Sequence, residues 1–287
     1  MPASSLLLRL YCAGVLIYLL APILSIIPLS FNAEPSFTYP LAGWSLRWYS
    51  EFLGSQAWQL ALKNSVIVAV GSTLAAGVLG TLAALGLSQR QCPLRAGLMA
   101  VLVAPMVVPV VITAVGFYAV FAQLGLLNSL AGLIVAHTAL GAPFVVITVT
   151  ATLSRFDNRL MWAAASLGAR PLTAFRRVML PAIAPGIAAG MVFAFVTSLD
   201  EVVIALFLAG PEQRTLPRQM WSGMRESISP TITAAASLLI VLSCASLAAA
   251  QWLQGRAARQ SAGTAGAGSP DTRPTPPRRS AADSRAA

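Results

Sequence analysis

Long apolar stretches, separated by short polar or basic segments, make up most of the first 253 residues of this chain. Six of them reach the ~20 residues that an α-helix needs to cross a bilayer. These stretches are residues 6–29, 60–87, 96–122, 129–153, 187–208 and 232–253. The first is longer than the apolar region of a signal peptide, and no clear A-x-A site follows it. The pattern therefore predicts an all-α integral membrane protein with six transmembrane helices and a transmembrane domain over residues 1–254.

Three segments depart from a plain series of straight helices. Pro105 and Pro109 lie inside the third stretch, and each removes a backbone donor, so the helix must bend or open there. Aromatic residues between positions 31 and 58 predict an amphipathic helix at the outer interface, either an anchor or a rim for a substrate-delivery protein. Residues 255–287 are rich in Gly, Ala, Ser, Pro and Arg, which predicts a disordered tail.

The composition agrees with a membrane protein and offers little material for catalysis. Hydrophobic residues make up 57% of the chain and charged residues 10%, against about 25% charged residues in soluble domains. There is one histidine, and the three cysteines do not have metal-binding spacing. We therefore expect no catalytic residue, no metal and no cofactor.

The basic residues separate into two sets along the chain. Fourteen of the 19 Lys and Arg residues flank the stretches on one side, and five flank them on the other. Cytoplasmic loops carry the excess of positive charge, so both termini and the loop around Gly168 are predicted to be cytoplasmic. A protein of this kind would be a multi-pass membrane protein. Its net charge of +10 then points to the lipid bilayer, with no nucleic acid as partner.

Residues 162–187, WAAASLGARPLTAFRRVMLPAIAPGI, make up most of the segment between the fourth and fifth stretches and must lie outside the hydrocarbon. These residues carry three arginines and no acidic residue. Gly168 interrupts an Ala-rich helix, and Pro171 is well placed to open a second, short helix. Leu180–Pro181 is expected to end that helix. The sequence predicts a helix–Gly–helix knob at the membrane face, which could also be an ordinary basic loop.

Asp200 and Glu201 are adjacent acids inside the fifth stretch, and eight apolar residues follow them. A charge near the bilayer centre costs about 2.5–3.5 kcal/mol, so such residues usually face a bundle interior or water. Successive helix positions differ by about 100°, so we expect one carboxylate to face a pathway and the other to bond elsewhere. The alternative is that the span ends earlier and both acids are interfacial. His137 is interpreted as a packed or interfacial residue.

Several of these motifs resemble those of ABC importer permeases. Ala163–Ala164, then Gly168–Ala169, then Leu180–Pro181 resembles the EAA loop of that family, although the family's glutamate falls on Trp162. The resemblance implies that residues 154–186 form a coupling loop that docks on a cytoplasmic ATPase. The segments S-L-D-E-V-V, A-G-P, T-L-P and I-S-P-T-I-T-A-A-A-S-L-L resemble the permeases of spermidine/putrescine importers.

That resemblance implies the type I importer permease fold, a place in the bacterial inner membrane and a cationic polyamine as the substrate. It also implies three kinds of partner: a second related permease, cytoplasmic ATP-binding subunits and a periplasmic substrate-binding protein. Asp200 and Glu201 would then lie on the substrate pathway. The chain lacks GxxxxGK[ST], so ATP hydrolysis would belong to a partner and this subunit would be non-catalytic. The alternatives are another small solute, a stand-alone secondary transporter or channel, and an intramembrane enzyme, which HExxH or GxSxG would have favoured.

Overall fold

The computed structural model describes residues 2–89, 93–226 and 229–266, and within these residues the chain is helical apart from loops and one isolated β-bridge. The elements are α1 (Pro2–Leu29), α2 (Arg47–Gly54), α3 (Gln56–Leu87), α4 (Arg95–Val107), α5 (Val110–Leu124), α6 (Leu130–Leu153), α7 (Arg159–Ser166), α8 (Pro171–Ala174), the π-helical turn η1 (Phe175–Met179), α9 (Leu180–Asp200), α10 (Val203–Leu208), α11 (Leu216–Glu226) and α12 (Thr231–Gly266). Five helical segments in the described residues are long and apolar enough to span a membrane, and the bent pair α4–α5 can supply a sixth span.

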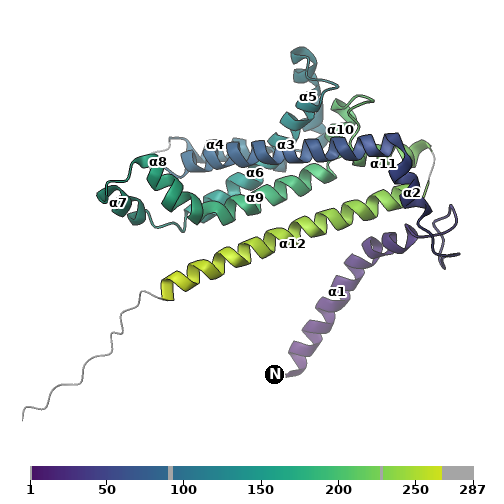
Figure 1. The fold of residues 1–287 in the computed structure, drawn as a ribbon, viewed down its shortest axis with the longest axis horizontal. Coiled ribbons are helices and arrows are strands. Elements are labelled where there is room, and N and C mark those ends of the chain that lie inside the picture. The colour runs from purple at the N-terminus through teal and green to yellow at the C-terminus, as the bar shows by residue number, and fades with distance from the viewer. Residues whose placement is uncertain (1, 90–92, 227–228, 267–287) are drawn as a thin grey trace, which may run out of the picture.

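Helices α3, α6 and α9 form the centre of the molecule and run along one another (Figure 1). Small residues form the contacts between them. Gly141 of α6 lies against Ala76 of α3 and Ala194 of α9, and Gly190 of α9 lies against Val145 of α6. In lipid, small residues of this kind allow helix backbones to approach closely. Gly80 of α3 also lies against Val145, so α3 and α6 are parallel and α9 is antiparallel to both.

Gly190→Ala is expected to destabilise this bundle. A Cβ at position 190 would lie 2.5 Å from both the Val145 Cα and the Thr148 Oγ1, so α6 and α9 would have to separate. Such overpacking costs about 1–3 kcal/mol. Thermal unfolding of the detergent-solubilised chain measures the effect. Gly86→Ala in α3 is the matched control, because a Cβ there would meet nothing within 4 Å. Equal melting temperatures for the two variants would contradict the close-contact account.

The third predicted span, residues 96–122, is broken more sharply than a kinked helix. The axes of α4 and α5 differ by 105°. The break falls at Val108, which is extended with φ −70° and ψ 132°, and Pro109 precedes the first residue of α5. A proline disfavours the helical region for the residue before it, so Pro109 explains the break. Pro105 remains inside α4 and does not interrupt it.

The helix that Pro171 opens does not end at Leu180–Pro181, so that expectation is wrong. It continues through η1 into α9, and residues Pro171–Asp200 form one 30-residue candidate span. At the junction the Leu180 N–H donates to the Phe175 carbonyl, five residues back. This π-type bond closes the turn, and Pro181 then falls in the first turn of α9, where a missing N–H is tolerated.

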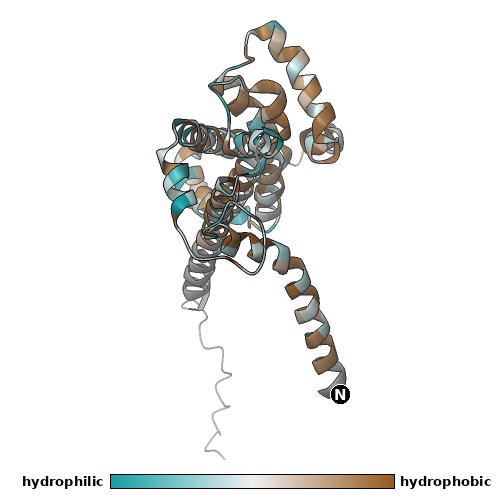
Figure 2. Ribbon diagram, turned by 90° about the vertical axis from the view of Figure 1, so that its right-hand side faces the viewer, coloured by the Kyte–Doolittle hydropathy of each residue, from teal (hydrophilic) through white to brown (hydrophobic). Residues whose placement is uncertain are grey.

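The last helix, α12, packs against α9 of this bundle, and α1 contacts α12. Apart from that contact, α1 stands away from the other helices and is apolar along its length (Figure 2). Helix α12 continues to Gly266, so it extends past the expected start of the tail at residue 255, and residues 267–287 lie outside the described part. The predicted aromatic amphipathic helix is confirmed as α2, which buries Trp48 and Phe52.

Candidate functional site

The fifth apolar stretch is broken at the acidic pair. Helix α9 ends at Asp200, Glu201 is extended with φ −74° and ψ 113°, and α10 begins at Val203. The predicted single span over residues 187–208 is therefore two helices. Close to this break, the Ser72 hydroxyl donates to the Ser198 Oγ at 3.1 Å. Ser72 lies near the middle of the 32-residue α3, so the break lies near mid-height of the bundle.

The Glu201 side chain binds the start of α10. Its Oε1 accepts hydrogen bonds from the backbone N–H groups of Val203 at 2.8 Å and Ile204 at 3.0 Å. The first N–H groups of a helix have no partner within the helix, and a carboxylate there also interacts favourably with the helix dipole. Glu201 therefore acts as a cap for α10, which explains why α9 does not continue through it.

Asp200 is exposed and, among the described residues, its carboxylate has no hydrogen bond or ion pair. A carboxylate at this depth cannot face lipid without a cost of about 2.5–3.5 kcal/mol. In the membrane it must therefore face water or another polypeptide. The two acids have different surroundings, as the sequence predicted. A helix break separates their side chains, rather than the 100° rotation between successive helical residues.

The other end of α10 is also held by polar contacts. The Asn128 N–H donates to the Leu208 carbonyl at 2.9 Å. The Arg218 guanidinium donates to the Ala209 and Gly210 carbonyls, and its burial, with a smaller effect from Arg214, lowers the Arg218 pKa. Sequence reasoning missed α10 as a separate helix. An acidic residue directly before a short apolar run is the capping signal that could have indicated it.

His137 is buried, as predicted for a packed residue, with 2% of its surface exposed. Its Nδ1 lies 2.8 Å from the Ser198 Oγ, two residues before Asp200. No group of three or more His, Cys, Asp or Glu residues that could hold a metal ion occurs within the described residues.

The loop around Gly168 has the predicted helix–Gly–helix geometry. Gly168 has φ +82° at the end of α7. Its N–H donates to the Ala165 carbonyl at 2.9 Å, and the Ala169 N–H donates to the Ala164 carbonyl at 3.0 Å. This pair of bonds is the Schellman arrangement, in which glycine takes the left-handed position after a helix. Ala163, one turn earlier, accepts a bond from the Leu167 N–H.

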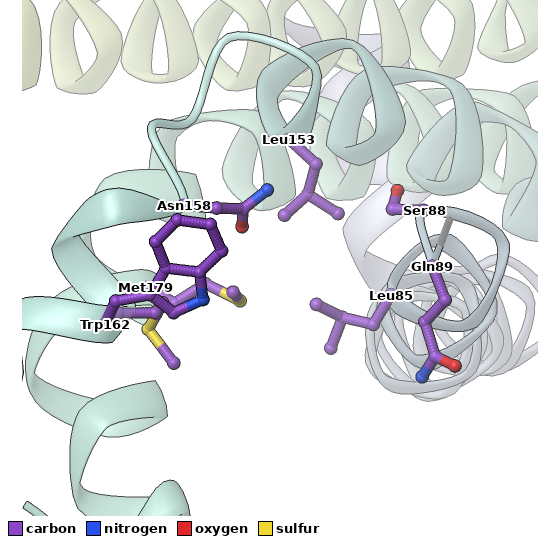
Figure 3. Close-up of a pocket in the computed structure, with 8 residues that line it drawn as sticks. Leu85, Ser88, Gln89, Leu153, Asn158, Trp162 and Met179 are labelled. Carbon is purple, nitrogen blue, oxygen red and sulfur yellow. The ribbon is translucent and has the colours of Figure 1, made fainter. Parts of the chain in front are cut away.

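Large apolar side chains are exposed on this loop, beside a cavity. Trp162 is 68% exposed and Leu167 is 89% exposed, although α7 belongs to no candidate span. A cavity of about 490 Å³ lies between α7, η1 and the end of α3. Figure 3 shows the Trp162 indole and Met179 on one side of it, with Leu85 and Gln89 opposite. Leu180 and Pro181 follow η1 directly, at the same end of the molecule, whereas the acidic pair is far along α9 (Figure 1).

Comparisons with known proteins agree with this architecture. The chain is 32% identical over 245 residues to the spermidine/putrescine transport system permease protein PotC of Escherichia coli, covering 84% of this chain and 91% of PotC. It is 34% identical over 235 residues to the putrescine transport system permease protein PotI of Escherichia coli, covering 78% of this chain and 82% of PotI.

The fold is shared with a solved bacterial alginate ABC transporter in complex with a pentasaccharide-bound periplasmic protein. The TM-score is 0.66 at 16% identity, over 88% of this chain and 94% of that one. The predicted importer permease fold is therefore confirmed. Residues 76–259 match the family of binding-protein-dependent transport system inner membrane components. Taken together, the family match and the identity to two permeases over most of its length show that the chain belongs to this family.

Proposed function

We propose that this chain forms part of the path by which an ATP-driven importer passes a cationic polyamine, spermidine or putrescine, into the cytoplasm. The names of PotC and PotI support this substrate class. The observation that carries the proposal is the unpaired, exposed carboxylate of Asp200 at mid-height of the bundle. A carboxylate in a partly dehydrated path can replace water around an ammonium group.

Another small solute remains the alternative within the same family. A bacterial ABC transporter that shares the fold is involved in the import of the acidic polysaccharide alginate. An unpaired carboxylate half-way along the path would repel such a cargo. The charge of Asp200 therefore favours a cation over an anion, and the chain length between two ammonium groups would distinguish one polyamine from another.

The proposed assembly contains a second, related permease, ATP-binding subunits and a periplasmic binding protein. Asp200 and the apolar α1 are both exposed in the isolated chain, which supports a second permease beside them. The bilayer covers the remaining apolar surface. ATP hydrolysis is assigned to a partner, because the sequence carries no phosphate-binding loop.

The loop over residues 154–186 is proposed to dock on the ATPase. Trp162 and Leu167 are apolar side chains exposed on a segment outside the candidate spans, and such surfaces mark interaction sites. Arg159 and Arg170 flank them, and Asp157 is the one acidic residue of the loop. The chemistry therefore fits an apolar cleft with an acidic rim on the ATPase.

Reconstitution tests the proposal. The chain is placed in liposomes with the candidate second permease, ATPase and binding protein, and uptake of labelled spermidine is measured with and without ATP. We expect uptake only with ATP and the complete set. Uptake by the chain alone would support a secondary transporter, and ATP-driven uptake of an anion in place of spermidine would refute the substrate assignment.

The proposed orientation places both termini and the Gly168 loop in the cytoplasm. The loop and the C-terminal end of α12 lie at one end of the molecule, and α2 and α11 at the other (Figure 1). A reporter fused after Gln213 is expected to read as periplasmic, and one fused after Gln91 or Arg256 as cytoplasmic, because of the arginine distribution. A cytoplasmic signal from the reporter after Gln213 would contradict this orientation.

A further inference from the structure

A buried chain of three polar side chains joins the central helices just before the acidic break. The His137 Nδ1 of α6 lies 2.8 Å from the Ser198 Oγ of α9, and the Ser72 hydroxyl of α3 donates to the same Ser198 Oγ at 3.1 Å. All three side chains are buried. Within the described part of the chain, these two are the side-chain hydrogen bonds that connect α3, α6 and α9 to one another.

The rest of this interface has no such directional contacts. Along α6, towards its C-terminal end, Gly141 and Val145 meet small residues of the neighbouring helices. Van der Waals contacts between small residues set the distance between helices but define the rotation of a helix about its axis only weakly. A hydrogen bond has a preferred direction, so Ser198 fixes the rotation of the last turn of α9.

That rotation decides where Asp200 points. Each helical residue advances by about 100°, so Asp200 lies roughly 200° around the axis from Ser198. Ser198 is buried against α3 and α6, and Asp200 is exposed, as this rotation requires. We propose that His137 is a positioning residue, which holds the last turn of α9 through Ser198 so that Asp200 faces the polyamine path. This inference rests on the proposed function of Asp200.

Packing alone does not account for an imidazole at this position. The His137 Nε2 is buried and has no hydrogen-bond partner among the described residues. A buried polar atom without a partner is destabilising in either tautomer, and a leucine of similar size would avoid that penalty. The contact that the imidazole does make, through Nδ1, is therefore its distinguishing contribution.

Two substitutions of His137 distinguish the effect of the Nδ1 hydrogen bond on uptake from the effect of side-chain packing. His137→Asn keeps an amide group near the Nδ1 position, whereas His137→Leu keeps the volume and removes the bond. In the reconstituted complex, we expect His137→Leu to lower the maximal rate of ATP-driven spermidine uptake by about three- to tenfold, the range of an interhelical hydrogen bond. His137→Asn should retain most of the rate. Thr138→Val is the matched control, because within the described residues the Thr138 hydroxyl bonds only to Ile134 of its own helix.

A second comparison distinguishes positioning from a general loss of structure. If His137 acts through Asp200, His137→Leu should cause no further loss of the residual uptake in an Asp200→Asn background. Ser198→Ala is a small change that leaves the packing nearly intact, and it should lower uptake as His137→Leu does. If His137→Leu fails to assemble, Ser198→Ala tests the inference in its place. All rates are normalised to the amount of assembled complex.

Normal uptake by both His137→Leu and Ser198→Ala would overturn the inference and leave the proposed function standing, provided that Asp200→Asn is impaired. The inference would also be overturned if His137→Leu lowered uptake by the same factor in the Asp200→Asn background as in the wild type. His137 would then act on a step that does not involve Asp200. Normal uptake by Asp200→Asn itself would overturn the proposed role of Asp200 in the substrate path, and the inference with it.

Discussion

Asp200→Asn is expected to lower ATP-driven polyamine uptake by at least about tenfold, while the complex assembles normally. Removing one member of a desolvated, hydrogen-bonded charge pair costs about 2–5 kcal/mol, and 1.4 kcal/mol corresponds to tenfold. The substitution keeps the shape of the side chain and deletes its charge. Because no described residue bonds to the Asp200 carboxylate, the fold loses no contact within the chain. The loss should therefore appear in uptake rather than in stability.

Glu201→Gln is the matched control for this experiment. A glutamine oxygen can still accept the N–H groups of Val203 and Ile204, so α10 keeps its cap and only the charge is lost. We expect less than about a fivefold change in uptake, since only a favourable charge–dipole term of about 0.3–1 kcal/mol is removed. Glu201→Ala removes the cap as well and should lower the melting temperature of the chain.

Initial rates of labelled spermidine uptake, normalised to the amount of assembled complex, decide between the two acids. A large defect in Glu201→Gln with normal uptake in Asp200→Asn would reverse the assignment. Normal uptake in both variants would mean that neither carboxylate meets the substrate. The case for a cationic cargo would then rest on the relatives alone.

The membrane architecture was largely predictable because it follows from local composition. Length and apolarity place the long helices, and the glycine that closes α7 is recognisable because a left-handed position favours glycine. The break at Asp200–Glu201 was not predicted. The apolar run continues across it, and hydropathy cannot distinguish a lipid-facing span from a short helix buried by α5 and α6.

The role of each acidic residue depended on three-dimensional contacts. Sequence reasoning could state that the two carboxylates diverge, but the cap on α10 requires Glu201 to leave the helical conformation. The link between His137 and Ser198 joins residues 61 positions apart, so no local pattern contains it. The continuity of α8 with α9 was missed for a different reason. Pro181 was expected to end the helix, but it falls in the first turn of α9, directly after the π turn at Phe175–Met179.

Gly168→Val is expected to uncouple ATP hydrolysis from transport. Gly168 has φ +82°, a conformation that is strained by roughly 1–3 kcal/mol for a residue other than glycine and is worst for β-branched side chains. A Cβ at this position would meet no atom within 4 Å, so the effect acts through the backbone alone. The two Schellman bonds would be lost, and α7 would no longer be held in its present direction relative to α8.

Gly168→Asn is the control that isolates this cause, because asparagine tolerates the left-handed conformation far better than valine. We expect Gly168→Val to lower ATP-driven uptake by about tenfold or more, a loss of roughly 1.4 kcal/mol or greater in coupling. Binding of polyamine by the isolated binding protein cannot change, and Gly168→Asn should stay near the wild-type rate. Uptake and substrate-stimulated ATPase activity are measured together in the same liposomes. If Gly168→Val retains both at wild-type levels, residues 154–186 do not transmit ATP hydrolysis to the path, and their exposed Trp162 and Leu167 must contact something other than the ATPase.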